Sequence, residues 1–416
     1  YMDPVDAFKL SLKINQKGGF DCPGCAWPDP DDDRSALGEY CENGMKAIAD
    51  EATKLSVTKE FFAEHSVAEI SKFSDFKMGK LGRLTEPMVL REGATHYEPI
   101  EWRDAFKLIA KELNALDSPD EAIFYTSGRT GNEAAYLYQL FIRSYGTNNL
   151  PDCSNMCHES SGIGLSHTLG IGKGSVTLND LHEAEVIMIM GQNPGTNHPR
   201  MLGALEKCKE NGGKIITVNP LPEAGLINFT DPQSPIKMMK GGTSLTDVFA
   251  PVKVNGDVAF LKAIMLKLVG MEDANPGKVL DWIFIQEHTH GFDNFLADLK
   301  KEDIKNAISE SGVAESIITK VADMMATNEK IIICWAMGLT QHKNGVGNIQ
   351  EVVNLLLMRG AIGKPGAGTC PVRGHSNVQG DRTMGIWEAP KEPFLAALDK
   401  VHGISAPREH GYHVVS

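Results

Sequence analysis

Short runs of apolar residues recur in the middle of the chain, and each run stops at a cluster of glycine, proline or amide residues. Val186 to Met190 are five apolar residues that end at Gly-Gln-Asn-Pro-Gly-Thr-Asn-His-Pro, and Ile331 to Trp335 end at Ala-Met-Gly-Leu-Thr-Gln. Lys214 to Val218 (KIITV) are expected to form a third strand, which is mostly apolar and ends at Asn-Pro. Unbroken apolar runs of this length are typical of strands that are buried on both faces. They predict the core strands of a parallel sheet.

In the segments between these runs, apolar residues recur at the spacing of an α-helix. A helix predicted from about 200 to 211 joins the first two strands, which implies parallel pairing with a right-handed crossover. A short buried strand is also expected at Ala122 to Tyr125. Further helices are expected at 101–116, 257–269, about 300–309 and 314–326, and much of 45–80 is expected to be amphipathic or exposed helix. Two more helices are expected to turn apolar faces to the core, one with Ala134, Leu137, Phe141, Ile142 and Tyr145, the other with Ile349, Val352, Val353, Leu356 and Leu357.

The loop from Gly191 to Pro199 follows the first strand and is a candidate ligand loop. Ligands of open α/β sheets collect beyond the carboxyl ends of the strands. The loop offers amides, hydroxyls and glycines rather than charges, which suits a large neutral heterocycle or a sugar-phosphate edge. An ordinary capped turn between a strand and a helix explains the same residues. A second glycine-containing loop, Ser127 to Gly131, is either an anion site or a well-made helix cap.

Composition narrows the class of protein. The 416 residues exceed one usual hydrophobic core, so two or three domains are expected. There are 41 Lys and Arg against 54 Asp and Glu, a net charge of -13, which disfavours nucleic acid as a partner. No run approaches the length of a membrane span. The chain opens Tyr1-Met2 and ends HGYHVVS, so we expect a fragment at both ends and consider export disfavoured.

Eight cysteines in a chain this long are too sparse for a disulfide scaffold. They favour a reducing compartment, and hence a cytoplasmic protein, with metal-binding or catalytic thiols. Cys22 and Cys25 are separated by Pro-Gly, which enforces a turn that can face both thiolates to one metal, and Cys41 follows after fifteen residues. A redox-active dithiol, an incomplete zinc knuckle and coincidence are the alternatives.

Four segments together resemble the molybdopterin oxidoreductase superfamily, and most closely its formate-dehydrogenase-like alpha-subunit branch. They read DCSNMCHESSG, VIMIMGQNPGTNHP, KIITVNP and the stretch from Trp335 to Gly385. The resemblance covers about residues 22 to 385. It implies an α/β fold in which a small amino-terminal iron-sulfur domain precedes two interleaved α/β domains with mostly parallel sheets, and nothing here resembles the family's carboxyl-terminal barrel. The implied domains are 1–99, 100–152 joined with 344–416, and 153–343, the last binding the pterin.

The resemblance also implies a cofactor and its ligands. The cofactor is molybdenum or tungsten held by two molybdopterin guanine dinucleotides, with Cys157 as protein ligand and His158 beside it as the second catalytic residue. A soft thiolate suits such a metal, and an imidazole can relay a proton near neutral pH. Cys153 is the competing ligand, and Cys157 as a plain loop thiol is the alternative. Pterin and guanine contacts are implied at Asn193, Gly195, Thr196, Asn197, Asn219, Met337, Gly338 and Gln341.

Two departures from the family pattern accompany these ligands. Asn219-Pro220-Leu221 stands where the family usually has Asp-Pro-Arg, which removes a charge from the nucleotide contact. Cys22, Cys25 and Cys41 match three of four ligands of a 4Fe-4S cluster, and Lys46 matches a lysine between cluster and pterin. The remaining cysteine is missing, and PDPDDDR stands in its place. A non-cysteine ligand or a three-iron form would accommodate this.

The expected function is therefore a two-electron oxidation or reduction of a small substrate at the metal. Electrons would pass through the iron-sulfur cluster to an electron-carrier protein or subunit. The alternative is a non-catalytic relative that keeps the fold as a scaffold or electron-conducting subunit of a redox complex. If the substrate is formate, Arg373 or Lys343 could hold its carboxylate.

Overall fold

A computed structural model describes residues 3–31, 34–35, 38–231 and 241–414. It divides into two compact units. The first unit contains Tyr1–Gly24, Gly38–Asp152 and Asn377–Ser416, and the second contains Cys25–Leu37 and Cys153–Ser376. The chain therefore passes from the first unit into the second and back twice, at 25–37 and at 153–376.

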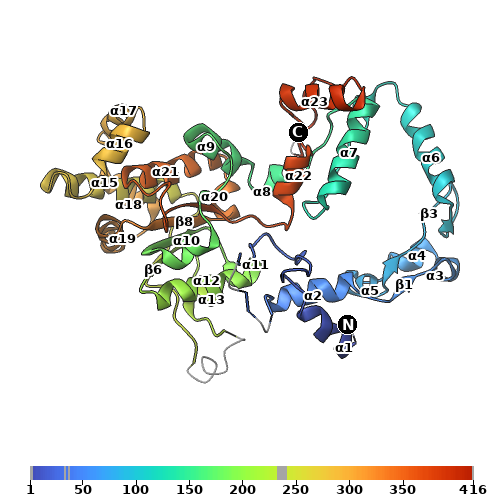
Figure 1. Ribbon diagram of the computed structural model, residues 1–416, viewed down its shortest axis with the longest axis horizontal. Coiled ribbons are helices and arrows are strands. Elements are labelled where there is room, and N and C mark those ends of the chain that lie inside the picture. Colours follow the sequence, from blue (N-terminus) through green and yellow to red (C-terminus); the bar gives the residue numbers. More distant parts are fainter. Residues whose placement is uncertain (1–2, 32–33, 36–37, 232–240, 415–416) are drawn as a thin grey trace. The chain divides into compact units, whose positions relative to one another are not determined.

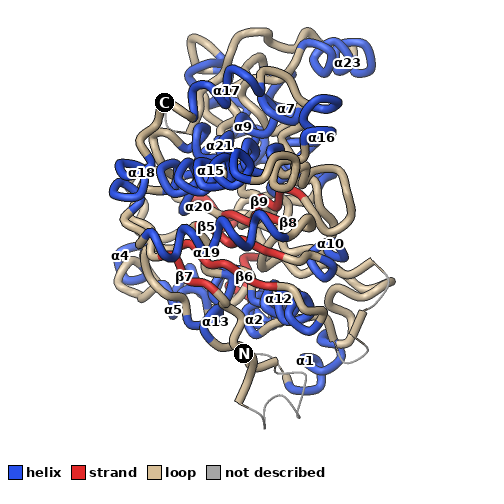
Figure 2. Tube along the Cα trace, turned by 90° about the vertical axis from the view of Figure 1, so that its left-hand side faces the viewer, coloured by secondary structure: helices blue, strands red, loops and turns tan. Residues whose placement is uncertain are grey.

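The second unit is organised around a parallel sheet, of which Figure 1 labels β6 and β8 and Figure 2 labels all five strands. The strand order is β7-β6-β5-β8-β9. The strands are β5 (Val186–Met190), β6 (Lys214–Val218), β7 (Val248–Ala250), β8 (Ile331–Trp335) and β9 (Gly368–Pro371). The three longest coincide with the predicted strands. β5 is the first strand in the chain and lies in the middle, so the strand order reverses between β5 and β8. Such a switch point is where ligands bind in open α/β sheets.

Helices cover both faces of this sheet (Figure 2). The helices of the second unit are α8 (Ser154–Cys157), α9 (Glu159–Leu169), α10 (Leu178–Glu183), α11 (Pro194–Asn197), α12 (Pro199–Glu210), α13 (Ala224–Ile227), α15 (Asp257–Ala274), α16 (Trp282–His288), α17 (Phe292–Leu299), α18 (Ile304–Ser311), α19 (Glu315–Thr327), α20 (Met337–Thr340) and α21 (Gly345–Met358). The predicted helices of this region are all present, within a few residues of their expected bounds.

Side chains of β5 divide between two cores. Val186, Met188 and Met190 belong to the core under α15, α19 and α21, whereas Ile187 and Ile189 belong to the core under α10 and α12. Successive residues of a strand point to opposite faces, so a strand with helices on both sides must be apolar throughout. All five residues are fully buried, which confirms the predicted strand.

The first unit contains helices and pairs of very short strands. Its elements are α1 (Pro4–Ser11), α2 (Glu42–Glu51), β1 (Ser56–Val57), α3 (Lys59–Glu64), α4 (Val67–Ile70), α5 (Asp75–Gly79), β2 (Arg83–Leu84), β3 (Met88–Val89), β4 (Glu98–Pro99), α6 (Trp102–Asn114), η1 (Pro119–Glu121), α7 (Asn132–Tyr145), α22 (Val378–Met384) and α23 (Glu392–His402). β1 pairs with β2, and β3 with β4.

The buried strand predicted at Ala122 to Tyr125 is wrong. The segment is extended, but Ile123 is 62% exposed and Tyr125 is 51% exposed. It receives a hydrogen bond from Asn149 Nδ2 at the Ala122 carbonyl at 3.1 Å, and the Phe124 N–H donates to the Asn149 carbonyl at 3.0 Å. The bridge that follows, Thr126 to Asp152, is isolated. An apolar pattern alone cannot tell a paired strand from an extended segment that lacks strand partners.

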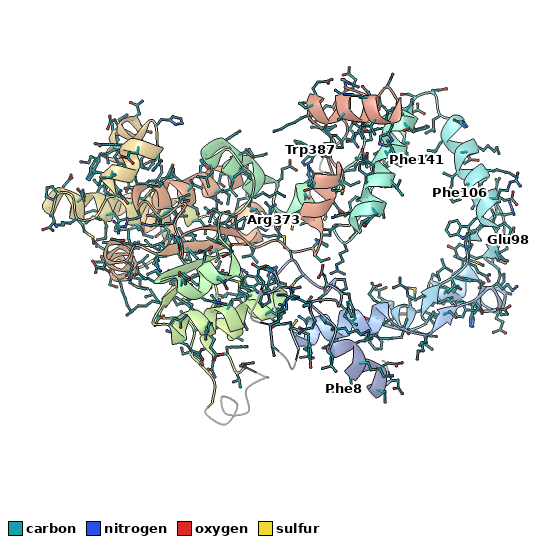
Figure 3. The ribbon with its side chains drawn as sticks, viewed as in Figure 1. Phe8, Glu98, Phe106, Phe141, Arg373 and Trp387 are labelled. Carbon is teal, nitrogen blue, oxygen red and sulfur yellow. The ribbon has the colours of Figure 1, made fainter. Side chains whose placement is uncertain are left out.

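The predicted apolar face of α7 is only partly correct. Ile142 is buried, but Leu137 is 65% exposed and Phe141 is 48% exposed (Figure 3). The helix turns a partly polar face inward, because the buried Arg143 donates hydrogen bonds to Gln139 Oε1 at 2.9 Å and to the Trp387 carbonyl at 2.8 Å. These bonds engage two of the three guanidinium nitrogens, whereas Nε has no partner among the described residues, and the apolar residues of the next face lie outward.

The compact units divide the chain at 152/153 and at 376/377. The predicted domain boundaries at 99/100, 152/153 and 343/344 remain predictions. Within the described parts of the chain, no helix combines the length and apolar character needed to cross a bilayer.

Candidate functional site

Two loops at the switch point of the sheet meet through glycines. Gly191 follows β5, and Gly338 lies in α20, the short helix that opens the β8 loop, as the segment between β8 and α21 is called here. The Gly338 N–H donates to the Gly191 carbonyl at 3.0 Å. A Cβ on Gly338 would lie 2.5 Å from the Gly191 Cα, so no side chain fits there. Gly191 also has a φ of +56°, which glycine adopts readily. The two loops therefore form one surface of bare backbone.

A second pair of glycines joins the β5 loop to the loop after β6. A Cβ on Gly195 would lie 3.2 Å from the Gly225 Cα, and one on Gly225 would lie 3.0 Å from the Gly195 Cα. Backbone that approaches this closely leaves room for a ligand to contact main-chain groups directly.

Asn219 connects the same loops through its side chain. Its Oδ1 accepts the N–H of Gln192 at 3.1 Å, and its Nδ2 donates to the Gln192 carbonyl at 3.0 Å. The residue is 4% exposed. Both polar groups of the carboxamide are thus engaged in holding the β5 loop, and direct contact of Asn219 with a nucleotide stays a prediction.

The other predicted residues of the β5 loop line its open side. Asn193 begins α11: its Oδ1 accepts the N–H of Thr196 at 3.2 Å, and its Nδ2 donates to Glu223 Oε2. Thr196 and Asn197 are exposed. The structure therefore gathers Asn193, Gly195, Thr196 and Asn197 in one short turn at the carboxyl edge of the sheet.

Two buried polar atoms in this loop have no hydrogen-bond partner within the described part of the chain. They are Gln192 Oε1 and His198 Nδ1. His198 Nε2 lies 2.6 Å from the Arg373 carbonyl, and burial lowers the pKa of His198, so the ring is neutral with Nδ1 as acceptor. Buried acceptors without donors fit a loop that binds a ligand or ordered water.

Cys157 lies at the end of α8 and contacts the β8 loop. The side chain is 7% exposed, and its Sγ is 3.5 Å from Met337 Sδ. Thr340 Oγ1 donates to the Cys157 carbonyl at 2.6 Å, and Gln341 Nε2 donates to the Met156 carbonyl at 2.8 Å. The structure thus brings together Cys157, Met337 and Gln341, as well as Gly338, from distant parts of the sequence. Cys153 lies one helical turn before Cys157 and is also buried.

His158 is fully enclosed. Its Nδ1 lies 2.9 Å from Ser161 Oγ and its Nε2 lies 3.0 Å from the Val372 carbonyl. Burial, reinforced by the positive charge of Arg373, lowers the pKa of His158 to about 3. The ring is therefore neutral at pH 7, donating from Nε2 and accepting at Nδ1. With both ring nitrogens engaged in these contacts, His158 is better suited to holding the chain beside Cys157 than to relaying a proton.

Arg373 belongs to the loop after β9 (Figure 3). It is 9% exposed, and its guanidinium donates to the carbonyls of His158 at 3.4 Å and Gly172 at 3.1 Å. The next residue, Gly374, faces Cys157, because a Cβ there would lie 3.7 Å from Cys157 Sγ. Lys343, the other predicted carboxylate-binding residue, is exposed between α20 and α21.

Cys22 and Cys41 come together in the first unit. A Cβ on Gly44 would lie 2.9 Å from Cys22 Sγ and 3.7 Å from Cys41 Sγ. The Gly24 N–H donates to Cys22 Sγ at 3.3 Å, and the Gly44 N–H donates to Cys41 Sγ at 3.4 Å. Backbone donors to sulfur suit thiolates that bind a metal or cluster.

Cys25 and Lys46 are the remaining predicted cluster residues. Cys25 belongs to the second unit, where it packs against the core under α12. Lys46 is an exposed residue of α2 in the first unit and forms an ion pair with Glu42 at 2.6 Å. The predicted cluster set is therefore divided between the two units, and a three-thiol cluster stays a prediction.

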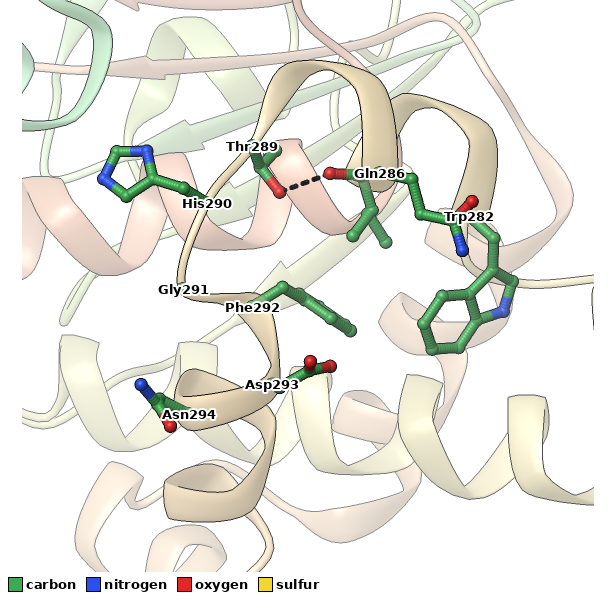
Figure 4. Close-up of a pocket in the computed structure, with 9 residues that line it drawn as sticks. Trp282, Gln286, Thr289, His290, Gly291, Phe292, Asp293 and Asn294 are labelled. Carbon is green, nitrogen blue, oxygen red and sulfur yellow. Dashed lines mark hydrogen bonds between the residues drawn. The ribbon is translucent and has the colours of Figure 1, made fainter.

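A separate cavity of about 390 Å³ lies where α16 turns into α17 (Figure 4). Its lining includes Trp282, Gln286, His290, Phe292 and Asp293. Thr289 Oγ1 donates to the Ile285 carbonyl at 2.7 Å and shapes the turn. His288 and His290 are exposed, and none of the predicted site residues lines this cavity.

A family model described as molybdopterin oxidoreductase matches residues 83–398 of this chain. The chain belongs to the molybdopterin oxidoreductase family. An uncharacterized oxidoreductase of Mycobacterium tuberculosis is 55% identical over 404 residues, 97% of this chain and 52% of the relative. Protein YdeP of Escherichia coli is 47% identical over 408 residues, 97% of this chain and 54% of YdeP. A putative formate dehydrogenase of Staphylococcus aureus is 31% identical over 345 residues, 80% of this chain and 33% of that protein.

A solved structure in the same family of folds is acetylene hydratase from Pelobacter acetylenicus, with a TM-score of 0.58 at 16% identity over 79% of this chain and 39% of that chain. At this identity the likeness concerns the fold alone. The expected molybdopterin superfamily and the mixed α/β fold with a mostly parallel sheet are confirmed. Family membership implies a molybdenum-pterin cofactor. The chain spans about half the length of the first two relatives.

Several residues that build the site were missed by the sequence patterns. Thr340 and Ser161 act through single hydroxyl groups, and Ser161 Oγ also accepts the indole N–H of Trp335 at 2.9 Å. Glu223 lies in a proline-containing loop without any motif. A local pattern carries no signal for such long-range hydrogen bonds, whereas the Gly-Gln-Asn-Pro-Gly cluster did mark its loop.

Proposed function

We propose that this chain forms the metal-binding part of a molybdopterin-dependent oxidoreductase of formate-dehydrogenase-like type. The cofactor would be molybdenum or tungsten with two molybdopterin guanine dinucleotides. The observation that carries the proposal is that the Sγ of Cys157 is buried beside Met337, after β8. This chain belongs to the molybdopterin oxidoreductase family, and the strand order of its sheet reverses between β5 and β8. A thiolate is the ligand expected for such a metal.

The residues around this thiol have distinct tasks. The contact between Gly191 and Gly338 keeps the edge of the sheet free of side chains, so that main-chain groups can bind the cofactor. Asn193, Thr196 and Asn197 offer polar groups from the β5 loop, and Asn219 positions that loop. When bound, the cofactor supplies the metal that exchanges two electrons with the substrate.

His158 and Arg373 hold the surroundings of Cys157. His158 fixes the chain next to Cys157 through the Val372 carbonyl, and Arg373 donates to the His158 carbonyl. We propose Arg373 as the cation that favours an anionic small substrate near the thiol, because its charge is almost fully shielded from water. The Staphylococcus aureus relative named as a putative formate dehydrogenase supports a carboxylate substrate.

The amino-terminal cysteines are proposed to hold a 4Fe-4S cluster that passes electrons to a carrier protein or subunit. Cys22 and Cys41 approach each other around Gly44, and Cys25 is the proposed third thiolate. Lys46 is proposed to lie between cluster and pterin, and the protein is proposed to be cytoplasmic. The alternative is a scaffold or electron-conducting subunit without turnover, which the missing cysteine in PDPDDDR favours.

The test is turnover in a dye-linked assay after replacement of Cys157 by serine. Cys157→Ser should keep the pterin, because the backbone contacts of the loops are unchanged, and should lose turnover. Cys208→Ser is the control, since Cys208 is buried under α12 with its Sγ 3.3 Å from the Ala184 carbonyl. Wild-type turnover in Cys157→Ser would exclude Cys157 as ligand and make Cys153 the thiol to replace. An inactive wild type that still binds the cofactor would favour the scaffold.

A further inference from the structure

We infer that Glu223 binds the ribose hydroxyls of one guanosine of the dinucleotide cofactor. The inference rests on the proposed function and adds a residue that none of the sequence motifs indicated. It follows from the strand order of the second unit, from the hydrogen bonds of Asn219 and from the hydrogen bond between Asn193 and Glu223.

The strand order sets where the nucleoside should lie. β5, β6 and β7 follow each other outward from the middle of the sheet, and β8 and β9 lie on the other side. This is the order of a dinucleotide-binding sheet. In such sheets the loop after the first strand faces the phosphates, and an acidic residue beyond the second strand hydrogen-bonds the ribose. The second strand here is β6.

The residue directly after β6 cannot serve as that acid. Asn219 carries no charge, and its Oδ1 and Nδ2 both bind the backbone of Gln192. The side chain is also only 4% exposed, so little of its remaining hydrogen-bonding capacity is accessible to a ribose. The task therefore falls to another carboxylate of the same loop.

Glu223 is that carboxylate. It is half-buried just before α13, and its Oε2 accepts from Nδ2 of Asn193 in the β5 loop. Its Oε1 accepts no hydrogen bond within the described part of the chain. A carboxylate offers about four lone pairs. Glu223 thus has capacity for both hydroxyls of a ribose, and Asn193 fixes its direction.

The charges of the loop place the ribose rather than the phosphates at Glu223. A carboxylate repels a pyrophosphate, so the phosphates should lie by the uncharged glycines of the β5 loop. Gly195 and Gly225, which pack against each other, hold the two loops in register between these positions. The β5 loop would then bind the phosphates, and Glu223 would bind the ribose.

Calorimetric titration with GDP and with 2′-deoxy-GDP tests the contact. The protein freed of cofactor should bind GDP about tenfold more tightly than 2′-deoxy-GDP, since a hydrogen bond to a charged group is lost with the hydroxyl. Glu223→Gln should weaken GDP about tenfold and bind both nucleotides alike. Glu223→Asp should give an intermediate result. Glu210→Gln, a change at an exposed carboxylate at the end of α12, should match the wild type.

Three results would overturn the inference. If Glu223→Gln keeps the preference for GDP, another residue binds the ribose, while the nucleotide site of the proposed function stands. If Glu223→Gln weakens both nucleotides equally, Glu223 contacts the base instead. If the wild type binds neither nucleotide, the nucleotide site of the proposed function fails together with the inference. Circular dichroism of each variant establishes that it is folded.

Discussion

The backbone N–H of Gly338 lies 3.0 Å from the carbonyl oxygen of Gly191, so the loops after β5 and β8 are joined without a side chain between them. A Cβ on Gly191 would lie 2.7 Å from the Gly338 Cα. This contact couples the candidate nucleotide loop to the loop that carries Met337 and Gln341. Any shift of one loop must move the other.

Gly338→Ala should separate the two loops. The added methyl group has no space, so we expect destabilisation of about 1–3 kcal/mol and loss of bound pterin. The measurement is the pterin content of purified protein together with its urea unfolding midpoint. Gly347→Ala is the control, because nothing lies within 4 Å of a Cβ on this helical glycine. A variant Gly338→Ala with normal pterin content would show that the close contact is not needed for binding.

The strands that the sequence predicts correctly are those with long apolar runs. β5, β6 and β8 have five residues each and lie between other strands, so burial marks them residue by residue. The edge strand β7 reads Val-Phe-Ala, an apolar run too short to indicate a strand, and the edge strand β9 reads Gly-Thr-Cys-Pro, which contains no apolar run. The inward face of α7 was predicted wrongly because the prediction assumed an apolar face. The buried residues include Arg143 and Gln139, which form a hydrogen bond with each other.

Some features of the candidate site could likewise be predicted from the sequence, and others could not. Cys157, Met337 and Gln341 were named from the family resemblance, and the structure places them together. The neutral, enclosed state of His158 could not be read from the sequence, because it depends on carbonyl groups of the distant β9 loop. The role of Asn219 in fixing Gln192 likewise arises from the parallel pairing of β5 and β6.

Glu272 should make the free energy of unfolding of the second unit fall at low pH. Burial acts to raise its pKa, but hydrogen bonds from Trp282 Nε1 and the N–H groups of Gly277, Leu280 and Val279 outweigh burial and lower the pKa to about 2. The stabilisation is complete above the unfolded pKa of about 4.3 and is lost as the pH falls toward 2. Glu272→Gln should cost up to about 3 kcal/mol at pH 7 and flatten this dependence.

Thermal unfolding at pH 7, 4 and 2.5 measures this effect. Glu287→Gln is the control, because the Glu287 side chain is 66% exposed on the neighbouring helix. If the midpoint of Glu272→Gln falls with acid as steeply as that of the wild type, Glu272 does not carry the dependence.

Asp381 should have the opposite pH dependence in the first unit. It is fully buried, and its carboxyl oxygens accept no hydrogen bond from the described residues. Burial, with the nearby charge of Asp152, raises its pKa to about 7. The folded state thus loses stability as the pH rises from about 4, where the unfolded acid ionises, to 7.

Asp381→Asn should remove that loss and stabilise the protein by roughly 1–3 kcal/mol at pH 8, with little change at pH 4. The unfolding midpoint at the two pH values measures it, with Asp117→Asn as the exposed control. A lower midpoint of Asp381→Asn at pH 8 would mean that the charged carboxylate is stabilised by an unseen partner.

The amino-terminal cysteines should bind iron. In anaerobically reconstituted protein, Cys22→Ser and Cys41→Ser should each lose the broad visible absorbance of an iron-sulfur cluster, because both thiols approach Gly44. Cys208→Ser should keep it, since burial raises the pKa of the Cys208 thiol to about 11 and keeps it protonated. If the wild type instead contains zinc and no iron, the cysteines form a different kind of metal site and the prediction of an iron-sulfur cluster is wrong.

The central claim is that Cys157 ligates a molybdenum or tungsten ion held by the pterin. X-ray absorption at the metal edge, on protein purified from cells that make the cofactor, tests this claim most directly. We predict about one metal per chain in a shell of sulfur ligands, with one sulfur fewer in Cys157→Ser and an unchanged shell in Cys153→Ser. A wild type without either metal, or a sulfur shell that is identical in wild type and Cys157→Ser, would contradict the account.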